Sequence, residues 1–263
     1  VEKIEYISEQ TSTEITDVEN PTHALVTYKG YIFKIDKTLK IISKIDKEEK
    51  EEDSKTLGYV EDGLKVLYDG KQNTKSGHNE KSNIWENLIE DEDIKNSMDG
   101  QLQNINFTTE SGWTENSLIL DGINDWVNVG YYYNSNMTIE IVAEPLNIVD
   151  DKTQYFLANV QSGGIGIYKN RKRKNSNEIY VSGYKYIVSE NEIIKNKLYS
   201  MSTGFNGTEM YFSENGTKYK ANYTGSIGKP NSSTVFAIAV DPSGTSDGTG
   251  GSEARFNMKV YSV

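Results

Sequence analysis

The sequence contains no cysteine. Disulfide frameworks and thiolate metal sites are therefore excluded. Histidine is also scarce: His23 and His78 are the only two, and each lies in a polar, turn-like stretch. With no neighbouring His and no serine nucleophile elbow, neither a zinc site nor a Ser-His-Asp system is expected. We expect His78 to hydrogen-bond loop backbone rather than to catalyse a reaction.

Positive charge and long apolar runs are in short supply as well. Arginine occurs only at positions 171, 173 and 255, and 39 acidic residues against 28 basic ones give a net charge of −11. Nucleic-acid binding requires an excess of Lys and Arg, so no nucleic-acid partner is expected. No apolar run approaches the roughly 18 residues of a membrane span, so no membrane insertion is expected either.

The chain is rich in residues that favour strands. Its 263 residues include 18 Tyr and 7 Phe, and aromatic side chains of this kind suit half-buried pleated sheets. The length allows one large β domain of about 200 residues with a smaller appendage.

Three segments follow from the pattern along the chain. Residues 1–45 contain an alternating run, Ala24–Ile35, and a second run, Leu39–Ile45, which predict a small β-hairpin module. Residues 46–61 begin with the charged run DKEEKEEDSK and are interpreted as an acidic linker, with an acidic interaction patch as the alternative. Because an isolated hairpin is marginally stable, we expect its strands to pair with the main domain or with a neighbouring subunit.

Residues 62–263 carry many short strand-like runs separated by turn signals. Met137–Val142 alternates apolar and polar residues, Glu178–Tyr186 and Lys197–Phe205 follow, and Asn215-Gly216 favours a tight hairpin. This pattern predicts an all-β fold, an antiparallel β-sandwich or jelly roll.

Several short motifs resemble the laminin-G-like, concanavalin-A-type lectin/glucanase family, in the form found in bacterial and phage surface proteins. Five motifs occur in the family's order: Tyr68-Asp69-Gly70, Gly77-His78, Trp85-Glu86-Asn87-Leu88, Met98-Asp99-Gly100, and Asp121-Gly122-Ile123-Asn124-Asp125-Trp126-Val127. Three later stretches match as well: Gln161–Tyr168, Tyr223–Pro230 and Phe256–Val263. Relatives usually continue past this last strand, so we expect either a trimmed chain or a closing element from elsewhere. The resemblance implies a concanavalin-A-like jelly roll.

The same family includes glucanases, whose two carboxylates stand on one strand in an E-x-D-x-x-E pattern. That pattern is missing from this sequence, and Glu140 and Glu144 would lie about 13 Å apart on an extended strand. Glycosidases need carboxylates about 5–9.5 Å apart. We therefore predict a protein that is not an enzyme.

The resemblance also implies a Ca²⁺ site at the sandwich rim. The loop DPSGTSDGTGGSE supplies Asp241, Asp247 and Glu253 as candidate ligands, and hard oxygen donors are what Ca²⁺ requires. A second turn holds Asp121, Asn124 and Asp125. For both loops the favoured alternative is that Asp and Gly simply build the turn. For Trp126, packing into the sandwich is favoured over ligand contact.

Aromatic platforms flanked by polar groups are the expected sugar-binding elements. The candidate ligand-binding residues are Trp113, Tyr132, Tyr184, Tyr186 and Asp247. Tyr180, Tyr184 and Tyr186 are evenly spaced and would share one sheet face, for which core packing is the favoured assignment. The basic run Lys169–Lys174 is interpreted as a solvated loop tip, with contact to anionic glycans or teichoic-type polymers as the alternative.

Together these features predict non-catalytic recognition of a surface glycan or cell-wall polymer. The resemblance suggests a phage, prophage or phage-tail-like receptor-binding component, extracellular or on a virion. A structural tail or virion module, in which the chain forms a homo-oligomer such as a trimer, is the alternative. A Gram-positive adhesin or a glycosidase accessory module would carry much the same sequence. Fold alone does not decide among them.

Overall fold

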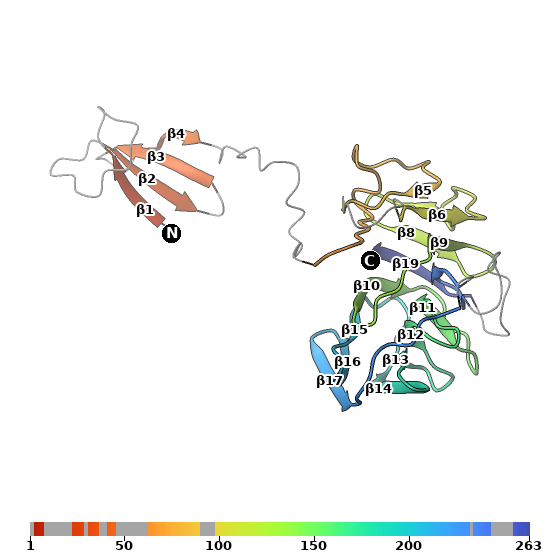
Figure 1. Cartoon of the computed structure of the whole chain (residues 1–263). Coiled ribbons are helices and arrows are strands. Elements are labelled where there is room, and N and C mark those ends of the chain that lie inside the picture. The colour runs from red at the N-terminus through yellow and green to blue at the C-terminus, as the bar shows by residue number, and fades with distance from the viewer. Residues whose placement is uncertain are drawn as a thin grey trace. The chain divides into compact units, whose positions relative to one another are not determined.

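The computed structural model divides the chain into two compact units, Val1–Asp62 and Gly63–Val263. In the second unit it describes residues 63–89, 98–231, 234–242 and 255–263, and in the first it describes the backbone of four strands. All the regular structure in these residues is β (Figure 1). No helix in this part of the chain has the length and apolar character that crossing a membrane would require.

The N-terminal unit contains a four-stranded antiparallel sheet in the order β1-β2-β3-β4. Its strands are β1 (Lys3–Ile7), β2 (His23–Tyr28), β3 (Tyr31–Asp36) and β4 (Ile41–Ile45). The expectation of one continuous strand over Ala24–Ile35 is wrong, because Tyr28 pairs with Tyr31 and the chain reverses between them. The sheet thus has two more strands than the predicted hairpin.

The C-terminal unit is an antiparallel β-sandwich of the concanavalin-A-like type, which confirms the predicted fold class. One sheet has seven strands in the order β17-β16-β15-β10-β19-β8-β7. These are β7 (Gly112–Trp113), β8 (Leu118–Asp121), β10 (Thr138–Pro145), β15 (Tyr199–Phe205), β16 (Glu209–Glu214), β17 (Thr217–Asn222) and β19 (Asn257–Ser262). The last strand of the chain, β19, is therefore internal, between β10 and β8.

The opposing sheet has eight strands in the order β14-β13-β12-β11-β18-β9-β6-β5. These are β5 (Ile84–Trp85), β6 (Gly100–Gln103), β9 (Trp126–Gly130), β11 (Gln154–Ala158), β12 (Ile165–Lys169), β13 (Lys174–Tyr180), β14 (Tyr184–Glu192) and β18 (Phe236–Ile238). Trp85 thus lies in a short strand of two residues.

The core lies between the two sheets. Ile141, Met201 and Phe212 project from one sheet and are fully buried. Ile167 and Ile179 project from the other into the same apolar cluster. Alternation within each strand places these side chains inside, because successive residues point to opposite faces of a sheet.

The Asp121–Trp126 motif forms a turn, as the sequence favoured. The Asp121 Oδ1 atom accepts hydrogen bonds from the amides of Ile123, Asn124 and Asp125. Gly122 has φ of 72°, and a Cβ on it would lie 2.7 Å from the backbone nitrogen of Asn257. Trp126 is buried and packs against Ala237 and Val240. The motif therefore connects two strands, as the sequence favoured, but the buried indole belongs to a small cluster that is separate from the sandwich core, so the expectation that Trp126 packs into the sandwich is wrong.

One predicted strand, Glu178–Tyr186, is in fact two. β13 ends at Tyr180 and β14 begins at Tyr184. Ser182 and Gly183 have φ of 50° and 114°, left-handed values that a strand cannot contain. The even spacing of the tyrosines had suggested a continuous strand, but the turn places Tyr180 opposite Tyr184 on its antiparallel partner.

Candidate functional site

The outer face of β11–β14, on the side away from the sandwich core, carries a group of aromatic residues. The pairing register places Tyr155 opposite Tyr168 and Glu178 opposite Tyr186. Tyr155 and Tyr168 form an apolar cluster that is separate from the core, with ring centroids 5.4 Å apart. A β-bulge between Tyr155 and Leu157 turns Tyr155 outward while Phe156 and Leu157 join the core.

Small residues lie next to these large ones. Ala158, Gly166, Glu178 and Tyr186 follow one another across the four strands. A Cβ on Gly166 would approach the Cβ of Ala158 to 2.8 Å, which is too close. A larger residue therefore does not fit at position 166 beside Ala158. The face is consequently uneven, with tyrosine rings standing beside positions that carry almost no side chain.

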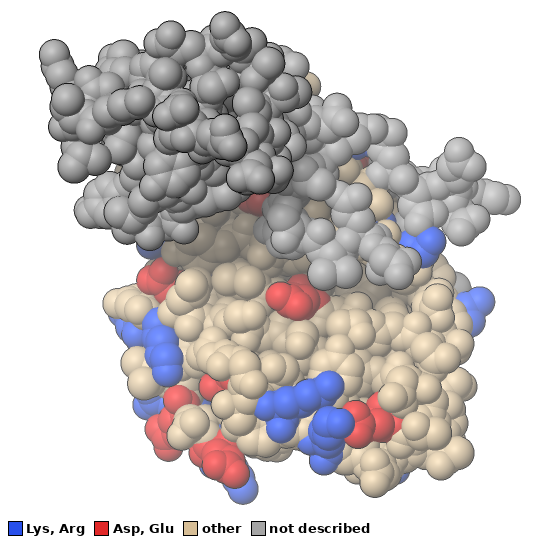
Figure 2. Space-filling view, turned by 90° about the vertical axis from the view of Figure 1, so that its left-hand side faces the viewer, with Lys and Arg blue, Asp and Glu red and all other residues tan. Residues whose placement is uncertain are grey.

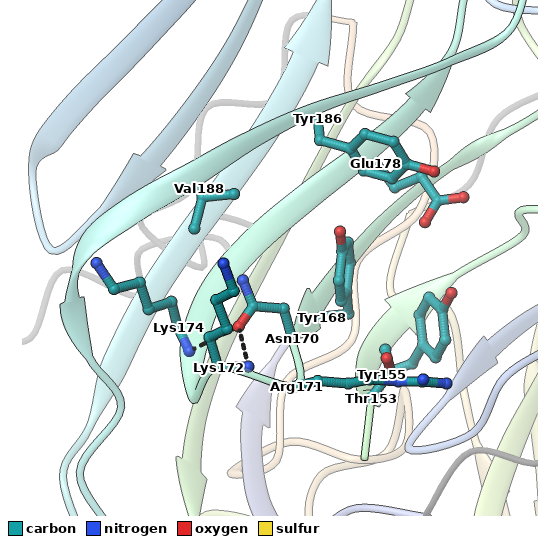
Figure 3. A pocket seen from close by; sticks show the side chains of 10 residues that line it. All are labelled: Thr153, Tyr155, Tyr168, Asn170, Arg171, Lys172, Lys174, Glu178, Tyr186 and Val188. Carbon is teal, nitrogen blue, oxygen red and sulfur yellow. Dashed lines mark hydrogen bonds between the residues drawn. The ribbon is translucent and has the colours of Figure 1, made fainter. Parts of the chain in front are cut away.

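A cavity of about 620 Å³ opens on this face (Figure 3). Its lining residues come from all four strands and from the segments that precede β11 and follow β12: Thr153, Tyr155, Tyr168, Asn170, Arg171, Lys172, Lys174, Glu178, Tyr186 and Val188. A volume of this size is typical of small-molecule sites. Among the described residues, the site therefore combines aromatic faces, hydroxyl groups, one amide, one carboxyl and several cations.

The turn that joins β12 to β13 forms one end of the cavity. Asn170 closes this turn: its Oδ1 accepts from the amides of Lys172 and Lys174 at 2.9 and 3.1 Å (Figure 3). Its backbone amide donates to the carbonyl of Lys174 at 2.9 Å. The Lys169–Lys174 run, interpreted from the sequence as a solvated loop tip, is thus a closed turn in which residues 171–173 are exposed and Lys169 is buried. Four of its side chains line the cavity: Asn170, Arg171, Lys172 and Lys174.

Glu178 is the carboxyl group among the lining residues. It is 9% exposed, and burial, with a further contribution from the nearby charge of Asp241, raises its pKa to about 7. Burial also raises the pKa of Tyr186, and the neighbouring Glu178 and Tyr184 add to this effect. At neutral pH the carboxyl is therefore only partly ionised, and it can both donate and accept hydrogen bonds.

A buried lysine fixes the segment that precedes β11 at the edge of the cavity. Lys169 is fully buried, and its Nζ donates to the carbonyl oxygens of Val149 and Lys152. The side-chain oxygen of Gln154 lies 3.4 Å away. These contacts hold the segment that carries Thr153 against the sheet.

The predicted ligand-binding residues occupy different places. Tyr186, 49% exposed, lines the cavity. Tyr184 does not line it, and its hydroxyl accepts from the amide of Ser162 at 2.9 Å. Because both side chains are well exposed, the favoured assignment of the tyrosine triplet to the core is wrong for them.

Two further candidates pack into the sandwich. Trp113 is 9% exposed; its Nε1 donates to the carbonyl of Ser82 at 2.7 Å and its ring meets Trp85 edge-on. Tyr132 is partly buried against the core. Asp247 lies outside the described residues. The structure thus brings one of the five predicted ligand residues, Tyr186, into the cavity.

The predicted Ca²⁺ ligands are described only in part. Asp241 interacts electrostatically with Glu178, whereas Asp247 and Glu253 lie outside the described residues. Within the described ranges, no group of three or more His, Asp or Glu side chains is arranged to hold a metal ion. In the other turn, Asp121 uses its Oδ1 for three backbone amides, which fits a turn-building role. The Ca²⁺ site remains a prediction.

Sequence reasoning missed Tyr155, Tyr168 and Glu178. Each belongs to a different strand, and the register that joins them is set by hydrogen bonds between segments. The only signal in the sequence is the cationic run beside β12, which by itself does not indicate its aromatic neighbours.

No protein-family model matches this sequence, and no curated protein matches it. Solved structures with a similar fold include Trypanosoma rangeli sialidase in complex with sialic acid, at 12% identity and a TM-score of 0.50. That match covers 76% of this chain and 30% of the sialidase chain. The chain therefore spans less than a third of the sialidase, and the likeness is one of fold.

Two further structures are similar over about half of the chain. Domains LG4-5 of the mouse laminin alpha1 chain match at 13% identity and a TM-score of 0.38, covering 49% of this chain and 34% of that one. The Ruminococcus gnavus IT-sialidase CBM40 bound to alpha2,3 sialyllactose matches at 10% identity and a TM-score of 0.38, covering 49% and 73%.

Proposed function

We propose that the C-terminal sandwich binds a carbohydrate or cell-surface polymer without catalysing its cleavage, at the cavity on the outer face of β11–β14. The observation that carries this proposal is the cavity lining. The rings of Tyr155, Tyr168 and Tyr186 surround it, and Asn170 and Glu178 add polar groups. Aromatic rings can cover the apolar faces of a sugar while polar groups fix its hydroxyls.

The lining favours binding over cleavage. A glycosidase usually requires two carboxyl groups about 5–9.5 Å apart across the scissile bond. Glu178 is the one carboxyl group among the described residues of the lining. A single carboxyl can position a hydroxyl, but it does not make up the usual catalytic pair.

Glycoside hydrolysis is a second candidate because of one feature. Glu178 has a pKa near 7, as a general acid requires, and Asp241 lies close enough to raise it. This activity would be established if the wild-type protein releases reducing ends from polysaccharide and the Glu178→Gln variant does not. Binding without product release would support the non-catalytic function.

The direct test of binding compares two tyrosines of the same strand on a glycan and cell-wall polymer array. Tyr186→Ala should lower the affinity of any hit about ten-fold, because it removes a ring from the cavity. Tyr184→Ala is the matched control, since Tyr184 is similarly exposed but does not line the cavity, and its hydroxyl is hydrogen-bonded to the amide of Ser162. If no glycan or polymer binds the folded protein, or if both variants lose affinity equally, the cavity is not a glycan site.

The biological setting is a further part of the proposal. The sequence resemblance to phage and bacterial surface proteins supports an extracellular or virion location and a role in host attachment, with adhesion or an accessory role as alternatives. Assembly of subunits is the structural alternative. Analytical ultracentrifugation of the whole chain tests it, since a monomer at micromolar concentration would remove the trimer hypothesis.

A further inference from the structure

Two polar side chains lie inside the sandwich near the start of β13. Asn175 is 1% exposed, and neither its Oδ1 nor its Nδ2 atom has a hydrogen-bond partner among the described residues. Glu214, on β16, is 8% exposed, and its Oε2 atom likewise has no partner among them. On the face shown in Figure 2, by contrast, acidic and basic side chains of the described residues lie exposed to solvent. The three buried atoms need a partner, because an unpaired polar group inside a protein is costly.

Alternation along β13 places Asn175 on the inner face of the sheet. Ile179, on the same strand, belongs to the core. Asn177 points inward as well, since its Nδ2 atom donates to the Thr203 hydroxyl of the opposing sheet at 2.6 Å. Residues two apart on a strand share a face. Asn175 is therefore directed between the two sheets, away from solvent.

Glu214 is directed into the same space from the other sheet. β13 lies against β16 across the sandwich. The Nδ2 atom of Asn177 also donates to the carbonyl of Tyr211 at 3.2 Å, which fixes the level at which these two strands meet. Phe212 and Glu214 are both buried residues of β16 and share its inner face. Asn175 and Glu214 are thus each within a few residues of that meeting point.

Contacts at the strand ends show that Asn175 and Glu214 lie at the same end of the sandwich. The amide of Ile193 donates to the carbonyl of Arg173, beside the start of β13, at 2.7 Å. The next amide along the chain donates to the Tyr199 hydroxyl at 2.8 Å. Tyr199 in turn interacts electrostatically with Glu214. Packed sheets lie about 10 Å apart, a gap that two polar side chains and a water molecule between them can fill.

We propose that ordered water is bound between the sheets at this point and joins the amide of Asn175 to the carboxyl of Glu214. Water can accept a hydrogen bond from Nδ2 and can donate to Oδ1 and Oε2, so it suits all three atoms. A cation would suit the two oxygens but would leave the hydrogens on Nδ2 unpaired. Lys169, which is buried and is opposite Asn175 in the pairing register, disfavours a cation further.

This water supports the strand that carries part of the cavity. Lys174 and Glu178 of β13 line the cavity, and the Ser176 hydroxyl accepts a hydrogen bond from the side chain of Asn170 in the adjoining turn at 3.1 Å. Asn175 lies among these residues on the inner face of the same strand. The link through water to β16 therefore fixes the start of β13, from which the turn and the cavity extend.

The first test detects the water directly, by NMR on the isotope-labelled full chain. Magnetisation transfer from water to side-chain amides should give a cross-peak at Asn175. The cross-peak should persist in Tyr199→Phe, which removes a hydroxyl proton that could relay the signal. Asn159 is the control and should give no cross-peak. It is fully buried, but its Nδ2 donates to the carbonyl of Tyr132 at 3.1 Å and its Oδ1 accepts from the amide of Ile165 at 2.9 Å.

The second test is the sign of a change in thermal stability. Asn175→Leu removes one side of the bridge and leaves the Glu214 carboxyl without it, so Tm should fall by about 5 °C. If no water were bound, the same change would remove two unpaired polar atoms and would raise Tm. Asn175→Leu/Glu214→Leu replaces both groups by apolar side chains and should recover most of the loss. If overpacking lowered Tm instead, the double variant would stay low and the NMR result would decide.

A water cross-peak at Asn175, with a fall in Tm for Asn175→Leu, is the expected result. A missing cross-peak, or a higher Tm for Asn175→Leu, would overturn the inference. A wild-type Tm that depends on whether Na⁺ or K⁺ is present at the same ionic strength would also overturn it, because the bound species would then be a cation. The proposed function of the cavity stands or falls separately, on the binding array.

Discussion

The two faces of β11–β14 differ although they are built from alternate residues of the same strands. The inner face presents Ile165, Ile167, Ile179 and Ile187, which are buried in the sandwich core. The outer face presents Tyr155, Tyr168, Glu178 and Tyr186 around a cavity. The inner face stabilises the fold by removing aliphatic surface from water, whereas the outer face combines apolar rings with groups that can hydrogen-bond to a ligand.

The comparison shows where stability and function are separated in this sheet. A change on the inner face should destabilise the protein, and a change on the outer face should alter binding. The exceptions are Glu178 and Lys169, whose polar groups are buried and therefore affect stability too.

The largest effect is expected from truncation on the inner face. Ile167→Ala should lower the free energy of unfolding by about 4 kcal/mol, because it removes buried methyl groups and leaves a cavity. Val188→Ala, on the outer face and 43% exposed, should change it by less than about 1 kcal/mol. Urea unfolding measures both. Equal losses would show that the two faces do not differ in this way.

The second effect concerns the pH dependence of stability through Glu178. Its folded pKa, about 7, is raised above the ordinary value of 4.5. The stability that it contributes is therefore complete below about pH 4.5 and is lost as the pH rises through about 7. Glu178→Gln should remove this pH dependence and stabilise the protein by about 3 kcal/mol at alkaline pH, with little change near pH 4.5.

The charged and titratable groups around Glu178 determine which variant can serve as the control for the pH dependence of unfolding. Asp241, Tyr168 and Tyr186 interact electrostatically with it, and the two tyrosines remain neutral because burial raises the pKa of each. Glu190→Gln, at an exposed position of β14, should leave the pH profile of unfolding unchanged. A profile that is the same for wild type and Glu178→Gln would contradict the burial argument.

A third, smaller effect is expected at Lys169. Lys169→Met should cost about 2 kcal/mol, since the carbonyls of Val149 and Lys152 lose a buried charged donor. It should also weaken ligand binding, because Thr153 lies in the segment that Lys169 holds. Lys172→Met, at an exposed position, should leave thermal stability unchanged. Unfolding curves that superimpose for all three proteins would show that the buried amine is dispensable.

The smallest effect is the one expected from Ca²⁺. If Asp241, Asp247 and Glu253 bind the ion with the millimolar affinity of extracellular sites, millimolar Ca²⁺ should stabilise the fold by about 1 kcal/mol. This corresponds to a rise in Tm of about 2–4 °C, which Asp247→Asn should abolish. A melting curve that is the same in Ca²⁺ and in chelator would remove the site.

Local patterns predicted much of the fold. The alternation in Met137–Val142 corresponds to the start of β10, and Asn215-Gly216 forms the turn between β16 and β17. The acidic side chain of Asp121 and the φ of Gly122 specify their turn through contacts within a few residues. The turn at Ser182-Gly183 requires a left-handed backbone conformation, which the alternation of residues does not reveal. The alternating pattern therefore predicted one long strand where the structure has two.

The candidate site was predicted much less well. Trp113, Tyr184 and Tyr186 have similar polar and Gly-containing surroundings in the sequence, yet the first is buried against Trp85, the second bonds to Ser162 and the third lines the cavity. Which side of a strand faces solvent depends on the sheet packed against it, and a single sequence does not contain that information directly.

The sequence by itself determined the all-β class, the absence of disulfide and thiolate chemistry, and the basic run at Lys169–Lys174, because composition and alternation act over a few residues. Only the tertiary structure decided that this run meets Tyr155, Glu178 and Tyr186 around one cavity. The register of four strands and one bulge brings these groups together. Burial by that arrangement also raises the pKa of Glu178, since the cost of ionising a carboxyl depends on the atoms that replace water around it.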